Sequence, residues 1–154
     1  MSAPATFLDG FEQKHAYDGS EILWRPTIHG LAIQDNKLFV IRPFGSTIFE
    51  PPGGKIELGE TRESAIRREF LEETGYQAEP LELFGFGEKW LFHQREKKFY
   101  HMLMQFWTVQ IGEKVQEPSD EHEFADFIPL DELDPAQFHE VMRVVITKLK
   151  QLSV

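Results

Sequence analysis

The stretch GKIELGETRESAIRREFLEETGY, residues 54–76, contains a predicted helix with a recognisable signal at each end. Strong helix formers fill positions 62–74 without an internal Gly or Pro. The Thr61 hydroxyl can accept a backbone N–H of the first turn, and Gly75 can adopt the positive φ that commonly ends a helix. We therefore predict a helix over Thr61–Thr74.

This predicted helix concentrates negative charge on one side. At about 100° per residue, Glu69, Glu72 and Glu73 fall within an arc of about 100°. Two like charges about 4 Å apart repel by roughly 1 kcal/mol in water and by several times more near a protein surface. A solvated acidic face is one interpretation. A cation site is the other, and it is favoured because Ile66 and Phe70 place Glu73 beside the buried face.

The glycine-rich segment PPGGK, residues 51–55, directly precedes these carboxylates. Glycine lets the backbone approach a ligand closely. Carboxylate and carbonyl oxygens beside such a segment suit a hard cation, Mg²⁺ or Mn²⁺. The chain has 16 basic and 26 acidic residues and a net charge of −10, so a bound divalent ion would offset its repulsion of a phosphate-containing ligand.

The same residues resemble the Nudix box of the Nudix hydrolase family, including its MutT-type members. The box reads Gly, five residues, Glu, seven residues, then Arg-Glu-U-x-Glu-Glu-x-Gly-U, where U is bulky and apolar. The chain fills every fixed position, with Gly54, Glu60, Arg68, Glu69, Glu72, Glu73 and Gly75. Only the aromatic Phe70 and Tyr76 depart from the usual aliphatic residues. The resemblance implies one Nudix domain over residues 1–154, an α/β/α sandwich with a mixed β-sheet between helices.

The resemblance further implies hydrolysis of a nucleoside diphosphate linked to another moiety, assisted by Mg²⁺ or Mn²⁺. Carried over to this chain, Glu69 and Glu73 would be the principal metal ligands. Glu72 would bind the metal directly or through water, and the backbone carbonyl of Gly53 would complete its shell. Glu69 and Glu72 would also be catalytic. Metal-bound water would attack phosphorus in line.

A further carboxylate outside the box often serves the family as metal ligand or general base. In the acidic loop before the predicted strand 124–130, Glu121 lies six residues before Phe127, the offset seen in MutT-type members. Glu123 and Asp120 are alternatives. A solvated acidic turn is the other interpretation of this loop.

Supporting and substrate-binding residues follow from the same resemblance. Arg68 would hold the helix carboxylates by salt bridge, and Glu60 would shape the turn into the helix. Arg42, at the end of a predicted strand, and Lys55 could each pair with phosphate. Phe49 lies just before the glycine-rich turn, where the family often places an aromatic wall. For the last three, core packing or a solvated charge is the alternative.

The remaining pattern predicts strands and one more helix. The first 20 residues suggest an edge element or arm, and residues 43–60 are dense in Gly and Pro and suggest a loop. Predicted elements are a hairpin over 28–42, strands 81–92, 98–111 and 124–130, and a final helix with Asp134 as its N-cap and Pro135 as its first residue. Their irregular alternation also favours a mixed sheet covered by helices.

The polar turn between strands 81–92 and 98–111 carries three basic residues, Arg95, Lys97 and Lys98. This turn is either simply exposed to solvent or contacts a distal phosphate of the substrate, and the sequence allows both interpretations. Aromatic residues of these strands could stack on a base or pack in the core; they are Trp90, Phe92, Tyr100 and Trp107.

Several classes of protein are excluded or disfavoured. The absence of cysteine removes disulfides, thiolate zinc sites, iron–sulfur clusters and a cysteine nucleophile. The acidic balance disfavours non-specific nucleic-acid binding, and no apolar stretch reaches the roughly 18–20 residues of a membrane span. We expect a cytoplasmic protein with a small nucleotide substrate, and a homodimer is possible because homodimers are frequent in the family.

The nucleotide itself is left open. A Pro about 15 residues after the box, typical of ADP-ribose hydrolases, is missing. The base-reading Asn of MutT-type members would fall at Met142. A nucleotide-binding Nudix domain that has lost hydrolysis is the alternative function, which the intact box carboxylates disfavour.

Overall fold

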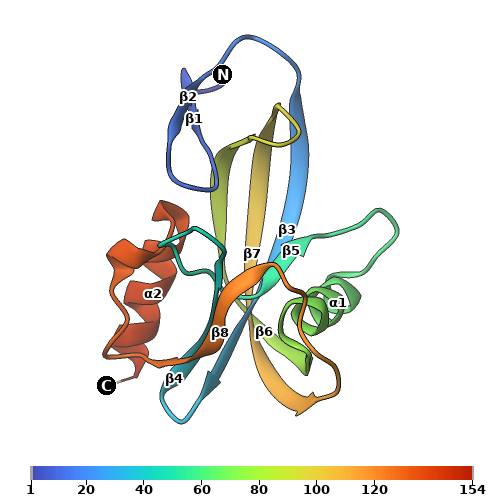
Figure 1. Ribbon diagram of the computed structural model, residues 1–154, viewed down its shortest axis with the longest axis vertical. Helices are drawn as coiled ribbons and strands as arrows, with labels where there is room; N and C mark the ends of the chain where they lie inside the picture. Colours follow the sequence, from blue (N-terminus) through green and yellow to red (C-terminus); the bar gives the residue numbers. More distant parts are fainter. Residues whose placement is uncertain (1, 154) are drawn as a thin grey trace.

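Three long strands form the centre of a mixed sheet (Figure 1). They are β3 (Ile22–Gln34), β6 (Tyr76–His93) and β7 (Lys98–Lys114). Strand β7 runs antiparallel to β6 and parallel to β3. The full strand order is β2-β1-β6-β7-β3-β4-β8, with β5 paired to β3. The computed structural model describes residues 2–153.

Shorter strands complete the sheet at its edges: β1 (Thr6–Leu8), β2 (Lys14–Ala16), β4 (Lys37–Pro43), β5 (Gly53–Lys55) and β8 (His122–Pro129). The predicted β3–β4 hairpin is confirmed, with Asp35 and Asn36 in its turn at φ of 50° and 60°. Asn and Asp tolerate this left-handed region better than other residues with a Cβ. Strand β3 nevertheless begins earlier than predicted.

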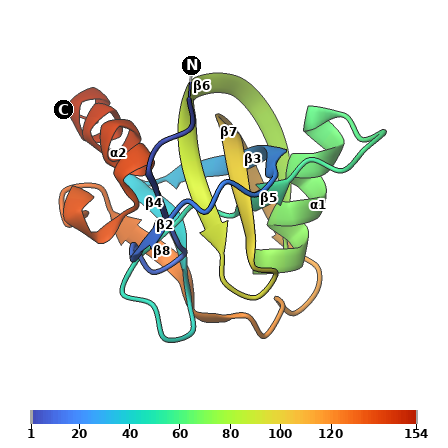
Figure 2. The ribbon, with the colours of Figure 1, turned by 90° about the horizontal axis from the view of Figure 1, so that it is seen from above.

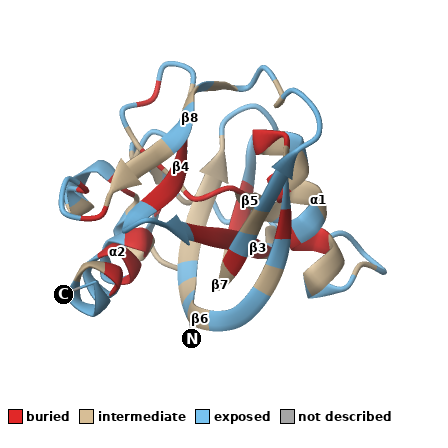
Figure 3. Ribbon diagram, turned by 90° about the horizontal axis from the view of Figure 1, so that it is seen from below, coloured by how far each residue is buried: buried red, intermediate tan, exposed pale blue. Residues whose placement is uncertain are grey.

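Two helices cover opposite faces of the sheet (Figure 2). Helix α1 (Arg62–Thr74) and helix α2 (Glu140–Leu152) stand on either side of it. Alternate residues of β3 point to the two helices: Ile28 and Ala32 belong to the apolar cluster of α1, and Leu31 to that of α2. Buried positions gather along β3, β4 and the inner side of α2 (Figure 3). The predicted α/β sandwich with a mixed sheet is confirmed.

The predicted signals at the ends of α1 are confirmed. Thr61 Oγ1 accepts the N–H of Ser64 at 3.1 Å. Gly75 lies at φ 78° and donates its N–H to the Leu71 carbonyl at 2.8 Å. Local sequence therefore determines both ends of this helix.

The predicted start of the final helix is wrong. Asp134 caps only a 3-10 turn, Pro135–Gln137. Phe138 then takes an extended conformation, pairs with Phe49 as a β-bridge and is fully buried. Because this buried bridge requires extended backbone, α2 begins only at Glu140.

The segment predicted as a loop at 43–60 contains a strand. β5 pairs antiparallel with β3, with Gly53 opposite His29. A Cβ on Gly53 would lie 2.2 Å from the Ile28 carbonyl oxygen, so only glycine allows this approach. The N-terminal edge element is confirmed as a small hairpin, β1–β2, whose Leu8 pairs in parallel with Leu91 of β6. No helix within residues 2–153 is long and apolar enough to cross a membrane.

Candidate active site

The carboxylates of α1 and the glycine-rich segment are in contact. The Gly53 N–H donates to Glu73 Oε2 at 2.7 Å. A Cβ on Gly54 would lie 2.6 Å from the carboxyl carbon of Glu69. The side chains of Glu69 and Glu73 are 14% and 16% exposed, whereas that of Glu72 is 55% exposed. Two of the three carboxylates are thus held between the helix and β5.

Negative charge is crowded at this contact. Burial raises the pKa of Glu73 well above its usual value, and the nearby carboxylates of Glu50, Glu69 and Glu121 add to this effect. The hydrogen bond from Gly53 opposes it. Burial also raises the pKa of Glu69. A cation placed here would relieve both the repulsion and the loss of hydration.

Arg68 joins the helix to the loop that precedes it. Its Nε and Nη2 donate to the two oxygens of Glu60 at 2.7 and 2.9 Å, and Nη2 also donates to the Lys55 carbonyl at 3.0 Å. Its Nη1 donates to Glu69 Oε1 at 2.9 Å. The paired hydrogen bonds from Arg68, with one from the Glu57 N–H, lower the pKa of Glu60 to about 2. The loop therefore holds the Arg68 guanidinium, which restrains Glu69 directly.

The loop before β8 lies against α1, where the Ser119 N–H donates to the Glu72 carbonyl at 2.9 Å. Glu121 in this loop lines a cavity of about 740 Å³. Glu123 instead forms a salt bridge with Arg42 at 3.4 Å. Asp120 is exposed. Of the three candidate bases, only Glu121 both lines this cavity and influences the pKa of Glu73.

Two residues near Glu73 were missed by the sequence reasoning. His122 is almost fully buried, with its Nε2 3.9 Å from Glu73 Oε1, and its Nδ1 has no hydrogen-bond partner within residues 2–153. Glu50 pairs with Ile41 through its backbone. The one available signal was position, because Glu50 directly precedes the Pro-Pro-Gly-Gly turn.

The predicted substrate residues occupy different surroundings. Arg42 lies over the ring of Phe49 at 5.6 Å, and its buried Nε has no hydrogen-bond partner in the described part of the chain. Phe49 itself is 9% exposed and packs against Phe138, so it belongs to the core. Lys55 is exposed and pairs with Glu57 at 3.3 Å. Of these three predicted substrate residues, only Arg42 therefore has a buried donor without a partner within residues 2–153.

The four strand aromatics that could have stacked on a base all contact other side chains. Trp90 stacks on His101, Phe92 lies 5.0 Å from the Phe99 ring, Tyr100 lies beneath the Arg25 guanidinium and Trp107 lies beneath that of Arg62. These contacts favour the packing interpretation.

The residues present fit a divalent cation. Within residues 2–153 no three His, Asp or Glu side chains already form a metal-binding group. The donor chemistry nevertheless suits Mg²⁺ or Mn²⁺. Glu69 and Glu73 are largely buried carboxylates, and Arg68, which pairs with Glu69, offsets only part of their negative charge. Glu72 is close enough along the helix to join them.

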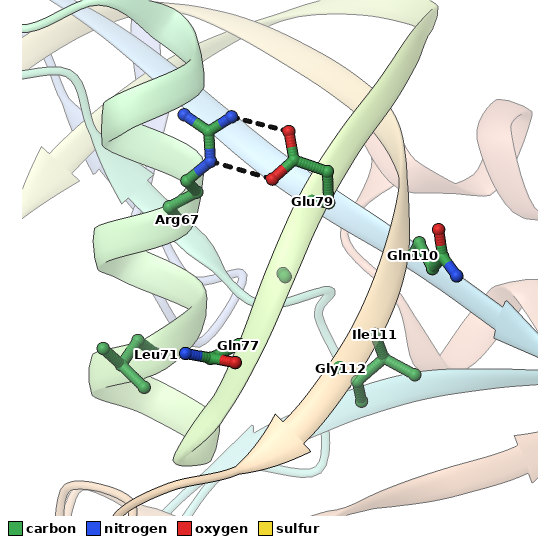
Figure 4. A pocket seen from close by; sticks show the side chains of 8 residues that line it. Arg67, Leu71, Gln77, Glu79, Gln110, Ile111 and Gly112 are labelled. Atoms are coloured by element: carbon green, nitrogen blue, oxygen red, sulfur yellow. Dashed lines mark hydrogen bonds and ion pairs between the residues drawn. The ribbon is translucent and has the colours of Figure 1, made fainter.

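A second cavity, of about 460 Å³, lies between α1 and strands β6 and β7 (Figure 4). Arg67 and Leu71 line it from the helix, and Arg67 donates two hydrogen bonds to Glu79, at 3.1 and 2.6 Å. Both helix residues lie on the opposite side of α1 from Glu69. This cavity is therefore separate from the carboxylates.

Comparison with known proteins identifies the family to which this fold belongs. The family model of the NUDIX domain matches residues 24–149. An 8-oxo-dGTP diphosphatase from Escherichia coli (strain K12) is 33% identical over 124 residues, which cover 77% of this chain and 90% of that protein. The chain belongs to the Nudix family, and it is a hydrolase of MutT-like type.

Solved structures support the fold. A MutT protein from Bacillus halodurans matches with a TM-score of 0.68 at 17% identity, over 82% of each chain. An ADP-ribose pyrophosphatase from Streptococcus suis 89-1591 matches with a TM-score of 0.62 at 14% identity, over 84% of this chain and 91% of that one. A MutT protein and an ADP-ribose pyrophosphatase thus share this fold, and the fold alone does not identify the nucleotide.

Proposed function

We propose that this protein is a metal-dependent pyrophosphohydrolase that cleaves a nucleoside diphosphate linked to another moiety. The observation that carries the proposal is the contact of Glu69 and Glu73 with the Gly53–Gly54 backbone. That contact places buried carboxylates beside a backbone that a ligand can approach closely. Membership of the family supports a nucleotide derivative as substrate.

Glu69 and Glu73 would hold Mg²⁺ or Mn²⁺, with Glu72 directly or through water and the Gly53 carbonyl in support. When bound, the ion supplies charge neutralisation of the pyrophosphate and lowers the pKa of a water ligand. Arg68 positions Glu69 and is itself held by Glu60. The burial of Glu69 and Glu73 strengthens their attraction to the cation because water screens them less.

Glu121 is proposed as the general base. It lines the 740 Å³ cavity and lies close enough to Glu73 to influence its pKa. Removal of a positioned general base lowers turnover by about 10²–10⁴-fold. Glu121→Gln should show such a loss in kcat at saturating Mg²⁺, while Glu123→Gln should not. Near wild-type turnover by Glu121→Gln would exclude this role.

Arg42 is the substrate-binding residue that the structure supports best. Its unpartnered Nε and its place at the end of β4 suit a phosphate oxygen. Lys55 and Phe49 remain predictions, as do a homodimer, a single domain over residues 1–154 and a cytoplasmic location.

The test is a turnover panel of nucleoside triphosphates, oxidised ones included, ADP-ribose, sugar nucleotides and dinucleoside polyphosphates, with and without Mg²⁺ or Mn²⁺. Products are identified by mass, and H₂¹⁸O locates the bond that breaks. We expect metal-dependent cleavage of a pyrophosphate bond that Glu69→Gln abolishes. Binding of nucleotides without turnover under every condition would instead support the alternative, a non-catalytic Nudix domain.

A further inference from the structure

The cavity that Glu121 lines extends away from the carboxylates of α1. Its other walls are the tip of the β1–β2 hairpin, at Gly10 and Phe11, and the end of β6 with the turn that follows, including Arg95 and Lys97. The volume of about 740 Å³ is sufficient for a nucleotide-sized ligand. No residue of this hairpin or this turn has a role in the proposed hydrolysis.

Hydrogen bonds to the Asp9 carboxylate hold the tip of the β1–β2 hairpin in place. Asp9 is fully buried and its Oδ1 accepts the N–H groups of Phe11 and Gln13 at 2.8 and 2.9 Å. Its Oδ2 lies 2.8 Å from His15 Nε2 and also accepts a hydrogen bond from the Gln94 amide. Because Gln94 belongs to the turn across the cavity, Asp9 joins the two walls.

A second contact anchors the hairpin to α2. Glu12, at φ 63°, contacts Nδ1 of His139, the residue that precedes α2. Lys89 Nζ lies 3.3 Å from the same nitrogen. Phe11 is placed between the Asp9 and Glu12 contacts, yet 51% of its surface is exposed. The backbone on either side of Phe11 is therefore fixed, and its exposed ring makes no aromatic or cation–π contact within residues 2–153.

The opposite wall carries unbalanced positive charge. Glu96 is the acidic residue of that turn, and its carboxylate is engaged by the Tyr100 hydroxyl and lies 3.7 Å from Arg25. Neither Arg95 nor Lys97 forms a salt bridge within residues 2–153. The Lys97 Nζ lies 5.9 Å from the centre of the Phe92 ring, which also lines the cavity. In a chain of net charge −10, these two cations beside a cavity make a local site for an anion.

We propose that this cavity binds a phosphorylated nucleoside, with its base against Phe11 and a phosphate against Arg95 and Lys97. Insofar as the bound group is part of the substrate, the inference rests on the proposed function. The site then defines the substrate class. The moiety linked to the nucleoside diphosphate would itself be a nucleotide, in preference to an uncharged sugar. Stacking would select an aromatic ring and the two cations an anion.

The experiment measures binding of adenosine 5′-monophosphate, adenosine and ribose 5-phosphate in EDTA, so that no turnover is needed. Calorimetry or NMR titration reports the Kd. Phe11→Ala should raise the Kd for adenosine 5′-monophosphate by about fivefold or more, which corresponds to the lower end of the losses measured when base stacking is removed. The Arg95→Ala/Lys97→Ala double variant should raise the Kd for adenosine 5′-monophosphate and for ribose 5-phosphate. Its Kd for adenosine should be unchanged.

Matched controls are Phe86→Ala, a phenylalanine on β6 that is 62% exposed, and Lys37→Ala, an exposed basic residue at the start of β4. Both should keep the wild-type Kd. Equal binding by the wild type and all variants, or no binding of the monophosphate at millimolar concentration, would overturn the inference.

Failure of one proposal can be told apart from failure of the other. Binding in this cavity without any hydrolysis would retain the nucleotide site and reject the proposed function. Hydrolysis with no effect of Phe11→Ala or the double variant on the KM of any substrate, and no binding in EDTA, would retain the proposed function and reject this site. If both hold, the double variant should raise the KM for dinucleoside polyphosphates more than that for sugar nucleotides.

Discussion

The two helices cover the same sheet in different ways. Helix α2 buries an apolar stripe, Met142, Val145, Ile146 and Leu149, against one face. Helix α1 buries Ile66 and Phe70 against the other face, but its neighbouring flank holds Glu69 and Glu73 partly out of water. The comparison shows that one covering helix is devoted to packing while the other combines packing with clustered charge.

The α1 carboxylates and the buried α2 side chains are also held by different kinds of contact. The carboxylates of α1 are held by directional bonds from Gly53 and Arg68. The buried residues of α2 are held by close packing, so a smaller side chain there lowers the stability of the fold. Substitutions of the α1 carboxylates should therefore affect activity more than stability, and those of the buried α2 residues the reverse.

The largest expected effect is that of Glu73→Gln on activity. It should lower kcat/KM by about 10²–10³-fold, the scale on which removal of one electrostatic group acts. The metal-free unfolding temperature should not fall, because Gln still accepts the Gly53 N–H and no longer repels Glu69 and Glu50. Steady-state kinetics and differential scanning fluorimetry measure the two. A large loss of stability with normal turnover would contradict the contrast between the helices.

Ile146→Ala should show the opposite pattern. Its side chain is fully buried between α2 and the sheet, so truncation should lower the free energy of unfolding by about 2–5 kcal/mol. The kcat per folded molecule should not change. Urea unfolding followed by circular dichroism provides the value. Val144→Ala, on the exposed side of the same helix, should stay within about 0.5 kcal/mol of the wild type.

Glu60→Gln tests the support beneath the α1 carboxylates. It removes one of the paired bonds to Arg68 and leaves Arg68 free to neutralise Glu69 more fully. Metal affinity should fall by about 10–100-fold, as for other residues that orient metal ligands. A Mn²⁺ titration followed by electron paramagnetic resonance measures it. Glu63→Gln, in the first turn of α1, is the control, and an equal loss there would point to a general charge effect.

The smallest effect concerns the hairpin, where Asp9 is held by hydrogen bonds. Although burial alone would raise the pKa of Asp9, its bonds to His15, Gln13 and Phe11 lower it. The charged form is thus favoured in the fold, so its contribution is present above the unfolded pKa of about 4 and is lost as pH falls through the lower folded value.

Asp9→Asn should therefore cost about 1 kcal/mol at pH 7 and progressively less below pH 4. Thermal unfolding at a series of pH values measures the difference. Asp131→Asn, an exposed residue after β8, should cost nothing at any pH. A penalty for Asp9→Asn that stays constant to pH 2 would show that shape, not charge, matters there.

Local features of the chain were predictable. The caps of α1 and the turn of the β3–β4 hairpin depend on residues close together in sequence, and both are confirmed. The start of α2 was not predictable from Asp134, because the burial of Phe138 against Phe49 outweighs the local cap. The strand within the glycine-rich segment depends equally on the close approach of Gly53 to β3.

The sequence by itself determined the family, the order of the box carboxylates and their common helix face, since helix geometry places residues three and four apart side by side. Only the tertiary structure brought Glu50 and His122 to Glu73, and only it placed Phe11 across a cavity from Arg95 and Lys97. These residues lie far apart in the chain. Their meeting depends on strand order and register, which are decided by burial of the whole sheet rather than by any local pattern.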